Sequence, residues 1–256
     1  MLTTKSLIVY LFFCHSLLYG TQEPKSQKKM ASAFLQEFLF GQGACYTLLG
    51  DKPVTSMSIF IGNAEQIYVD GLSEEALRTL TFVDGNMQEY FNAWKAITSN
   101  KTFKNFFFFE ESSPEDPTSI CIYFMNIQSL KTVFHKHYPL FYKHTKIPTW
   151  TSFLEELKRP NQLLWKQLFQ DHKLAGILYG FSEDNARTFI KPSISRSFSD
   201  IPVACATQEH FSLPIYVVSE KDKTVEKYKK QREKIKKIYN NQDVLDITFK
   251  ILQNQH

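Results

Sequence analysis

The chain has 256 residues, of which 43% are hydrophobic and 15% aromatic, with 23 phenylalanines and only nine glycines. This composition supports a buried core, and the shortage of glycine argues against a turn-rich all-β fold. The formal net charge is +4, but residues 221–237 hold nine Lys or Arg and three Asp or Glu, so the rest of the chain is mildly acidic. A nucleic-acid-binding protein would show a broad basic face, so no nucleic-acid partner is predicted.

The first twenty residues have the layout of an export signal. Met1–Lys5 is short and carries one positive charge, Leu7–Tyr19 is an apolar run of thirteen residues, and Gly20 is a small residue before a polar stretch. This order predicts a signal peptide at 1–20, followed by one domain at 21–256 that works outside the cytosol. Localisation is predicted as periplasmic, secreted or envelope-associated. An uncleaved anchor is the alternative, although about 20 apolar residues are needed to span a bilayer.

The N-terminal part of the predicted domain combines a helix with a hairpin. Apolar residues recur at helical spacing over 27–40, and Gly41 ends the pattern. Cys45–Leu49 and Ser56–Ile61 look like short strands. Gly50–Pro53 lies between them and has turn chemistry, so a hairpin is expected.

The middle of the chain is predicted to hold two helices and two buried strands. Ser73 is a good N-cap for a helix that runs to Phe82, and Met87–Ile97 shows one clear apolar face. Thr102–Phe109 and Ser119–Phe124 are short, apolar and rich in aromatic or β-branched residues, which indicates strands. The acidic, proline-containing Glu110–Thr118 is expected to be a surface loop between them.

Four further helices are predicted from capping residues and apolar spacing: one capped by Asn126 and stopped by Pro139, one capped by Thr151 and ended by Pro160, one over 161–179 followed by Gly180, and one over 183–190 capped by Ser182. The proline- and serine-rich stretch 191–214 is expected to be irregular, with a strand over 211–218. The elements together predict a helix-dominated α+β fold, as a single domain with one small, mostly antiparallel sheet.

The C-terminal region is predicted to form two helices, and the first is strongly basic. Within 223–239, a narrow apolar seam is spaced three, four, three and four, at Val225, Tyr228, Arg232, Ile235 and Tyr239. The other faces are charged, so the helix is expected to dock by a thin seam. It is either a solvated surface helix or a binding surface for an acidic protein or an anionic surface. Asp243 is expected to cap a last helix that ends near Leu252.

Few residues suggest chemistry. Catalytic residues are predicted to be absent, and the alternative is a thiol nucleophile at Cys45 with a histidine base such as His137. Cys45, Cys121 and Cys205 remain after signal removal, and the sequence does not fix whether any of them are disulfide-bonded. The only histidine cluster, His135, His137 and His144, lacks the spacing of a zinc site, so neither a metal nor a cofactor is predicted. No phosphate-binding glycine motif occurs.

Three segments together resemble exported bacterial proteins of unknown function. They are Gly50-Asp51-Lys52-Pro53 after Cys45–Leu49, the run Gly176–Gly180 with Glu183, Asn185 and Ala186 just after it, and the lysine-rich helix with the following Asp243–Leu252. The resemblance covers most of the mature chain in scattered pieces. It implies export but no assigned activity, so no functional residue is transferred.

The preferred function from sequence is a non-catalytic exported protein that binds a macromolecule or an envelope surface. The alternative is an exported thiol hydrolase that uses Cys45 and one histidine. The two differ in geometry. A hydrolase needs the Cys45 sulfur within hydrogen-bond reach of an imidazole in an open cleft, whereas a binding protein can bury Cys45 among apolar side chains.

Signal removal gives the first testable prediction. Intact mass spectrometry of the protein recovered outside the cytosol should show a chain that begins just after Gly20, because a small residue there follows the apolar run. Recovery of the full-length chain would contradict cleavage and support the anchor.

Overall fold

The computed structural model describes residues 26–61, 87–112, 119–159, 162–188 and 223–254. These residues form a helix-dominated α+β fold around one small antiparallel sheet, which confirms the fold class expected from the sequence. None of the described helices combines the length and the apolar character needed to span a membrane.

In the described part of the chain the sheet has three strands, β1 (Val54–Phe60), β2 (Phe106–Ser112) and β3 (Ser119–Asn126), in the order β1-β3-β2. Both pairings are antiparallel, and β3 is the central strand. Side chains alternate between the two faces of a strand, so β3 supplies two cores. Ile122 and Phe124 enter the first core, and Tyr123 and Met125 enter the second.

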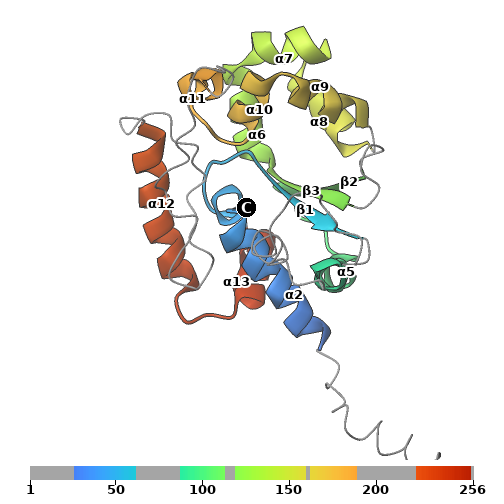
Figure 1. Cartoon of the computed structure of the whole chain (residues 1–256), viewed down its shortest axis with the longest axis vertical. Helices are drawn as coiled ribbons and strands as arrows, with labels where there is room; N and C mark the ends of the chain where they lie inside the picture. The colour runs from blue at the N-terminus through green and yellow to red at the C-terminus, as the bar shows by residue number, and fades with distance from the viewer. Residues whose placement is uncertain (1–25, 62–86, 113–118, 160–161, 189–222, 255–256) are drawn as a thin grey trace, which may run out of the picture.

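The helices fall into two groups, one on each face of the sheet (Figure 1). The first group packs on the first core: α2 (Gln27–Gln36), the π-helical turn η1 (Glu37–Gly41), α3 (Cys45–Leu48), α5 (Met87–Thr98) and α13 (Val244–Asn254). The second group packs on the second core: α6 (Ile127–Lys136), α7 (Tyr138–Thr145), α8 (Trp150–Lys158), α9 (Gln162–Gln170) and α10 (His172–Leu178). The short helix α11 (Glu183–Thr188) packs on α10. The long helix α12 (Lys223–Tyr239) stands at one side of both groups.

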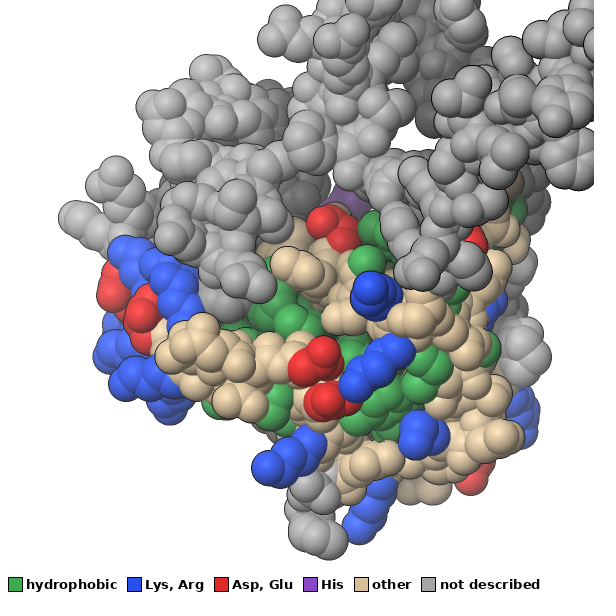
Figure 2. All heavy atoms as spheres, turned by 90° about the horizontal axis from the view of Figure 1, so that it is seen from below, with side chains coloured by type: hydrophobic (Ala, Val, Ile, Leu, Met, Phe, Trp, Pro, Cys, Tyr) green, Lys and Arg blue, Asp and Glu red, His purple; other side chains and the backbone are tan. Residues whose placement is uncertain are grey.

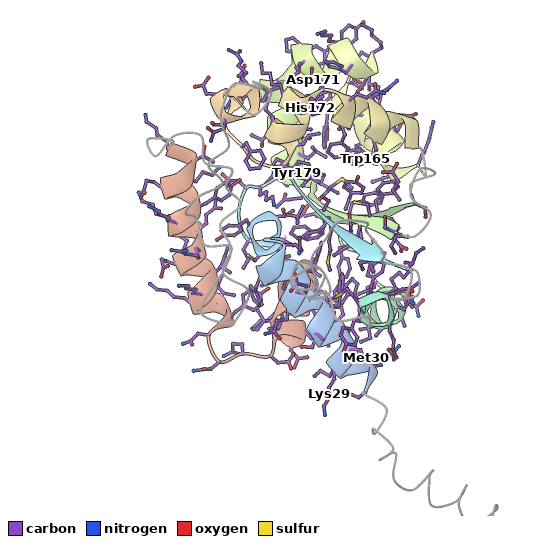
Figure 3. The ribbon with its side chains drawn as sticks, viewed as in Figure 1. Lys29, Met30, Trp165, Asp171, His172 and Tyr179 are labelled. Carbon is purple, nitrogen blue, oxygen red and sulfur yellow. The ribbon has the colours of Figure 1, made fainter. Side chains whose placement is uncertain are left out.

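Contacts between aromatic rings run through both cores. In the first core, the Phe34 ring lies 5.3 Å from Phe38 and 5.1 Å from Phe91, centroid to centroid. In the second, Trp165 stacks on Tyr123 at 5.4 Å, on the side of the sheet that carries α9 and α10 (Figure 3). Such pairs add about 0.5–1.5 kcal/mol each beyond the area that they bury.

Capping residues mark most helix starts where the sequence predicts them. The Asn126 side chain accepts hydrogen bonds from the backbone N–H groups of Gln128 and Ser129, at 3.1 and 3.0 Å. Ser182 and Asp243 cap α11 and α13 in the same way. Gly180 follows α10 with φ of 88°, the left-handed conformation that suits glycine after a helix.

The predicted hairpin over residues 45–61 is wrong, because Cys45–Leu48 forms the single helical turn α3. A short apolar run fits a buried helical turn as well as a strand, and here β1 finds its partner in β3 instead. The buried hydroxyls of Thr47 and Thr55 lie 2.7 Å apart and tie α3 to β1.

Three helix boundaries also differ from the prediction. The helix expected over 161–179 is divided at Asp171, whose carboxylate accepts a hydrogen bond from the Leu174 N–H at 2.8 Å and so starts α10. Thr149, rather than Thr151, caps α8. Pro139 lies in the first turn of an additional helix, α7, where proline is tolerated because that N–H would lack a helical partner.

Several predictions lie outside the described residues: the signal peptide at 1–20, the helix from Ser73 to Phe82, and the segment 191–214 with the strand over 211–218. The loop predicted over Glu110–Thr118 lies partly outside them, and its first three residues continue β2.

Candidate functional site

Cys45 begins α3 and is fully buried in the first core. Burial raises the pKa of its thiol to about 12, and the opposing charge of Lys52 has a smaller effect. A nucleophilic cysteine needs a lowered pKa and access to solvent. The environment of Cys45 is therefore that of a small buried hydrophobe.

His137 lies between α6 and α7, on the helices that cover the second core. Its Nδ1 is 3.9 Å from Oε2 of Glu183, whose Oε1 also accepts from Lys173 and Arg187, both at 2.6 Å. Burial, together with the nearby Lys136, lowers the pKa of His137. The described structure thus places Cys45 and His137 on opposite sides of the sheet and does not bring them together.

The other histidines in this region do not form a site with His137. His135 is exposed, and His144 Nε2 lies 3.1 Å from Oδ2 of Asp171 without the alignment of a hydrogen bond. Within the described ranges, no three His, Cys, Asp or Glu side chains are grouped as they would be around a metal ion.

The structure reveals an unexpected buried group at Lys52. Lys52 belongs to the segment Gly50–Pro53, to which the sequence assigns turn chemistry, and only 6% of it is accessible to solvent. Burial lowers the pKa of its amine to about 8, with Cys45 acting weakly in the opposite direction. Among the described residues no carboxylate forms an ion pair with Lys52, and burial disfavours the charged form of its amine.

Lys52 belongs to a junction, hereafter the α3–α10–α12 junction, made by Tyr46, Asp51, Lys52, Gly180 and Tyr228. The Tyr228 ring is completely buried and lies edge-on to Tyr46 at 5.3 Å. Its hydroxyl donates to the Gly180 carbonyl at 2.9 Å. A Cβ at Gly180 would collide with that hydroxyl and lie 3.1 Å from Lys52 Cγ, so the junction requires glycine there.

Asp51 fastens the surface side of this junction to α12. Its Oδ2 lies 2.7 Å from Lys227 Nζ, and its Oδ1 accepts from Gln231 Nε2 at 2.6 Å. All three segments of the predicted resemblance, the Gly50–Pro53 turn, the Gly176–Gly180 run and the lysine-rich helix, therefore meet in space.

The docked face of α12 matches the predicted seam. Tyr228, Ile235 and Tyr239 are buried, and Arg232 is half-buried. The Tyr239 ring packs edge-on against Phe40 at 5.2 Å, and its hydroxyl lies 3.1 Å from the Thr248 hydroxyl of α13. A thin line of contacts thus fixes the rotation of the helix about its own axis.

The opposite face of α12 carries a line of five lysines, hereafter the lysine stripe. Its members are spaced four, three, four and three, and all are exposed: Lys223, Lys227, Lys230, Lys234 and Lys237. At about 1.5 Å per residue the stripe is about 21 Å long. Of the five, only Lys227 is in an ion pair with a described carboxylate.

Figure 2 shows Lys and Arg side chains gathered at the left edge of the molecule, the side on which α12 lies in Figure 1. The two glutamates of α12, Glu226 and Glu233, pair with Lys229, Arg232 and Lys236, which lie off the stripe. Of the carboxylates that the structure describes, only Asp51 pairs with a lysine of the stripe. This arrangement can bind an extended anionic surface, and it requires no reacting group.

Sequence reasoning identified the basic helix but missed both the stripe and Lys52. The stripe was detectable, because lysines at i, i+4, i+7, i+11 and i+14 share one helical face. Lys52 was not, because a Gly-Asp-Lys-Pro sequence is typical of an exposed turn.

No family model, curated protein or solved structure matches this chain. The resemblance to exported bacterial proteins stays a prediction.

The buried amine predicts a specific pH dependence of stability. Because the pKa of Lys52 is lower in the folded than in the unfolded chain, the unfolded state binds more protons between about pH 8 and 10.5. Wild-type stability should therefore rise over this window relative to Lys52→Met. The advantage of the Met variant in unfolding free energy should be about 3 kcal/mol larger at pH 7 than at pH 10.5.

Chemical denaturation of both proteins at several pH values measures this difference. Cys45 and the tyrosines titrate in both proteins, so their effect largely cancels in the difference between the two unfolding free energies. Lys131→Met, at an exposed position on α6, controls for effects of the substitution on the unfolded chain. A Lys52→Met difference that is constant from pH 7 to 10.5 would show that the amine is not desolvated.

Proposed function

We propose that this chain is a non-catalytic exported protein that associates with an anionic membrane surface of the cell envelope through the lysine stripe. The observation that carries the proposal is the position of the stripe, directly opposite the buried seam of α12. The seam uses the apolar side chains for docking, and the five lysines are left facing water.

A planar anionic surface suits this stripe for geometric reasons. Five charges along one side of a straight helix can all approach a plane of headgroups together. Each Lys or Arg near an anionic surface contributes about 1 kcal/mol. Because the apolar side of α12 is turned inward, the helix cannot insert as an interfacial amphipathic helix does. Binding should therefore be peripheral, electrostatic and sensitive to salt.

The thiol-hydrolase alternative draws no support from the described residues. Cys45 is buried in an apolar core, its pKa is raised, and His137 is engaged near Glu183 on the other side of the sheet. Each of these features is the opposite of what a thiol nucleophile requires.

Vesicle sedimentation tests the proposal with the mature chain, residues 21–256. It should pellet with vesicles that contain phosphatidylglycerol and stay in solution with pure phosphatidylcholine. At 1 M salt, where the screening length falls to about 3 Å, binding to the anionic vesicles should be lost. Replacement of Lys230, Lys234 and Lys237 by Gln should weaken binding roughly 100-fold, since about 3 kcal/mol is removed.

A matched control removes the same charge elsewhere. Lys131, Lys136 and Lys143 are exposed on α6 and α7, and their replacement by Gln should leave vesicle binding within a few-fold of wild type. Equal losses in the two triple variants would show that net charge, not the stripe, drives binding. No binding to anionic vesicles at low salt would refute the membrane proposal and leave an acidic protein as the candidate partner.

A further inference from the structure

The outer edge of β2 is open within the described part of the chain. β2 pairs with β3 on one side, and no described strand pairs with its other side. Along such an edge, backbone N–H and C=O groups point away from the sheet and are ready to pair with another strand. Natural proteins usually protect an edge strand of this length from pairing with other chains, so an open edge suggests a place where another strand binds.

A groove of about 570 Å³ runs beside this edge. Its apolar lining includes Trp94 of α5 and Phe106 and Phe108 of β2. Lysines surround the groove, with Lys95 and Lys101 on the α5 side, Lys104 in the turn before β2, and Lys158 at the end of α8. The groove therefore offers an incoming strand both apolar contact and positive charge.

The sequence of the edge is complementary to itself in the antiparallel direction. Lys104 precedes four consecutive phenylalanines, and Glu110 and Glu111 follow them. Lys104 and Glu110 are each three residues from Phe107. Lys104 lies in the turn that leads into β2, two residues before its first residue, Phe106. Two copies of β2 that run antiparallel about Phe107 would therefore place Phe106 opposite Phe108, and would bring Lys104, just before β2 of each copy, close to Glu110 of the other.

This register is also compatible with two-fold symmetry. A two-fold axis perpendicular to the sheet can pass between two identical residues that lie directly opposite each other in an antiparallel pair. In this register those two residues are Phe107 of each copy. In this register an even-numbered residue always lies opposite an even-numbered residue, and an odd-numbered one opposite an odd-numbered one. Side chains that belong to one face of each sheet therefore stay on the same face of the joined sheet. The Phe106 and Phe108 side chains of both copies would lie on the first-core face, and Phe107 and Phe109 on the second.

The charges involved are available for such a contact. Lys104 is exposed, and no ion pair of the described residues includes it. Glu110 accepts from Lys95 at 3.0 Å through Oε2, and no other described cation forms an ion pair with this carboxylate. Its side chain is 43% exposed, so a lysine from another molecule can reach it.

We propose that two copies of this chain dimerise by antiparallel pairing of their β2 edges about Phe107, which joins the two sheets into one of six strands. The lysine stripe lies on α12, which plays no part in this contact between strands. The proposed dimer therefore does not depend on the proposed membrane association.

Sedimentation velocity over a range of protein concentrations tests the proposal on the mature chain. The wild type should show a reversible monomer–dimer equilibrium. Lys104→Glu should raise the dissociation constant at least about tenfold, because two glutamates would then face each other twice across the axis. Glu110→Lys should do the same, and the double variant Lys104→Glu, Glu110→Lys should restore dimerisation.

Two further variants keep the result decisive. Lys95→Gln removes the ion pair that Glu110 makes within its own chain. It changes neither Lys104 nor Glu110, so it should leave the dimer intact. If Glu110→Lys fails to fold, Lys104→Gln should weaken the dimer less than Lys104→Glu, because only the latter adds repulsion. A monomeric wild type at all concentrations, single variants that dimerise like wild type, or a double variant without rescue would each overturn the proposal.

Discussion

The burial of Tyr228 at the α3–α10–α12 junction is the constraint on which the orientation of α12 depends. Its phenol is sealed from water, its ring packs on Tyr46, and its hydroxyl reaches the carbonyl of Gly180. Loss of this hydrogen bond would leave a buried polar group without its partner, which costs about 1–3 kcal/mol. Together with the buried Ile235 and Tyr239 further along the helix, this anchor decides which side chains of α12 face away from the core.

The same junction includes one clearly unfavourable feature, the buried amine of Lys52. Its aliphatic stem packs near Gly180, which is a favourable use of an amphipathic side chain. The charged end is desolvated, and burial lowers its pKa to about 8. A buried lysine of this kind is easily replaced by an apolar residue of similar size as far as stability is concerned.

The architecture followed from the sequence where local signals agreed with one another. The Asn126 cap and the apolar face of Met87–Ile97 are as predicted, and so is the burial of Tyr228, Ile235 and Tyr239 in the seam of α12. The error at Cys45–Leu49 has the opposite cause, because four or five apolar residues carry no usable period. β1 pairs with β3, which is far away in the chain, and residues 45–48 are left to form a helical turn.

The candidate sites could be predicted only in part, for similar reasons. Charge spacing along one helix is a local property, so the lysine stripe was within reach of the sequence. The burial of Lys52 depends on α10 and α12, which no local pattern reveals. The separation of Cys45 from His137 likewise depends on which face of the central sheet each helix covers.

Lysine footprinting on membranes tests the central claim most directly. The mature chain would be acetylated by an N-hydroxysuccinimide ester with and without phosphatidylglycerol vesicles, which contain no primary amine, and modification would be quantified at each lysine by mass spectrometry. We expect strong protection of Lys223, Lys227, Lys230, Lys234 and Lys237, and unchanged modification of Lys131, Lys136 and Lys143. Protection of those control lysines to the same extent, or protection at Lys101, Lys104 and Lys158 while the stripe stays reactive, would contradict the account.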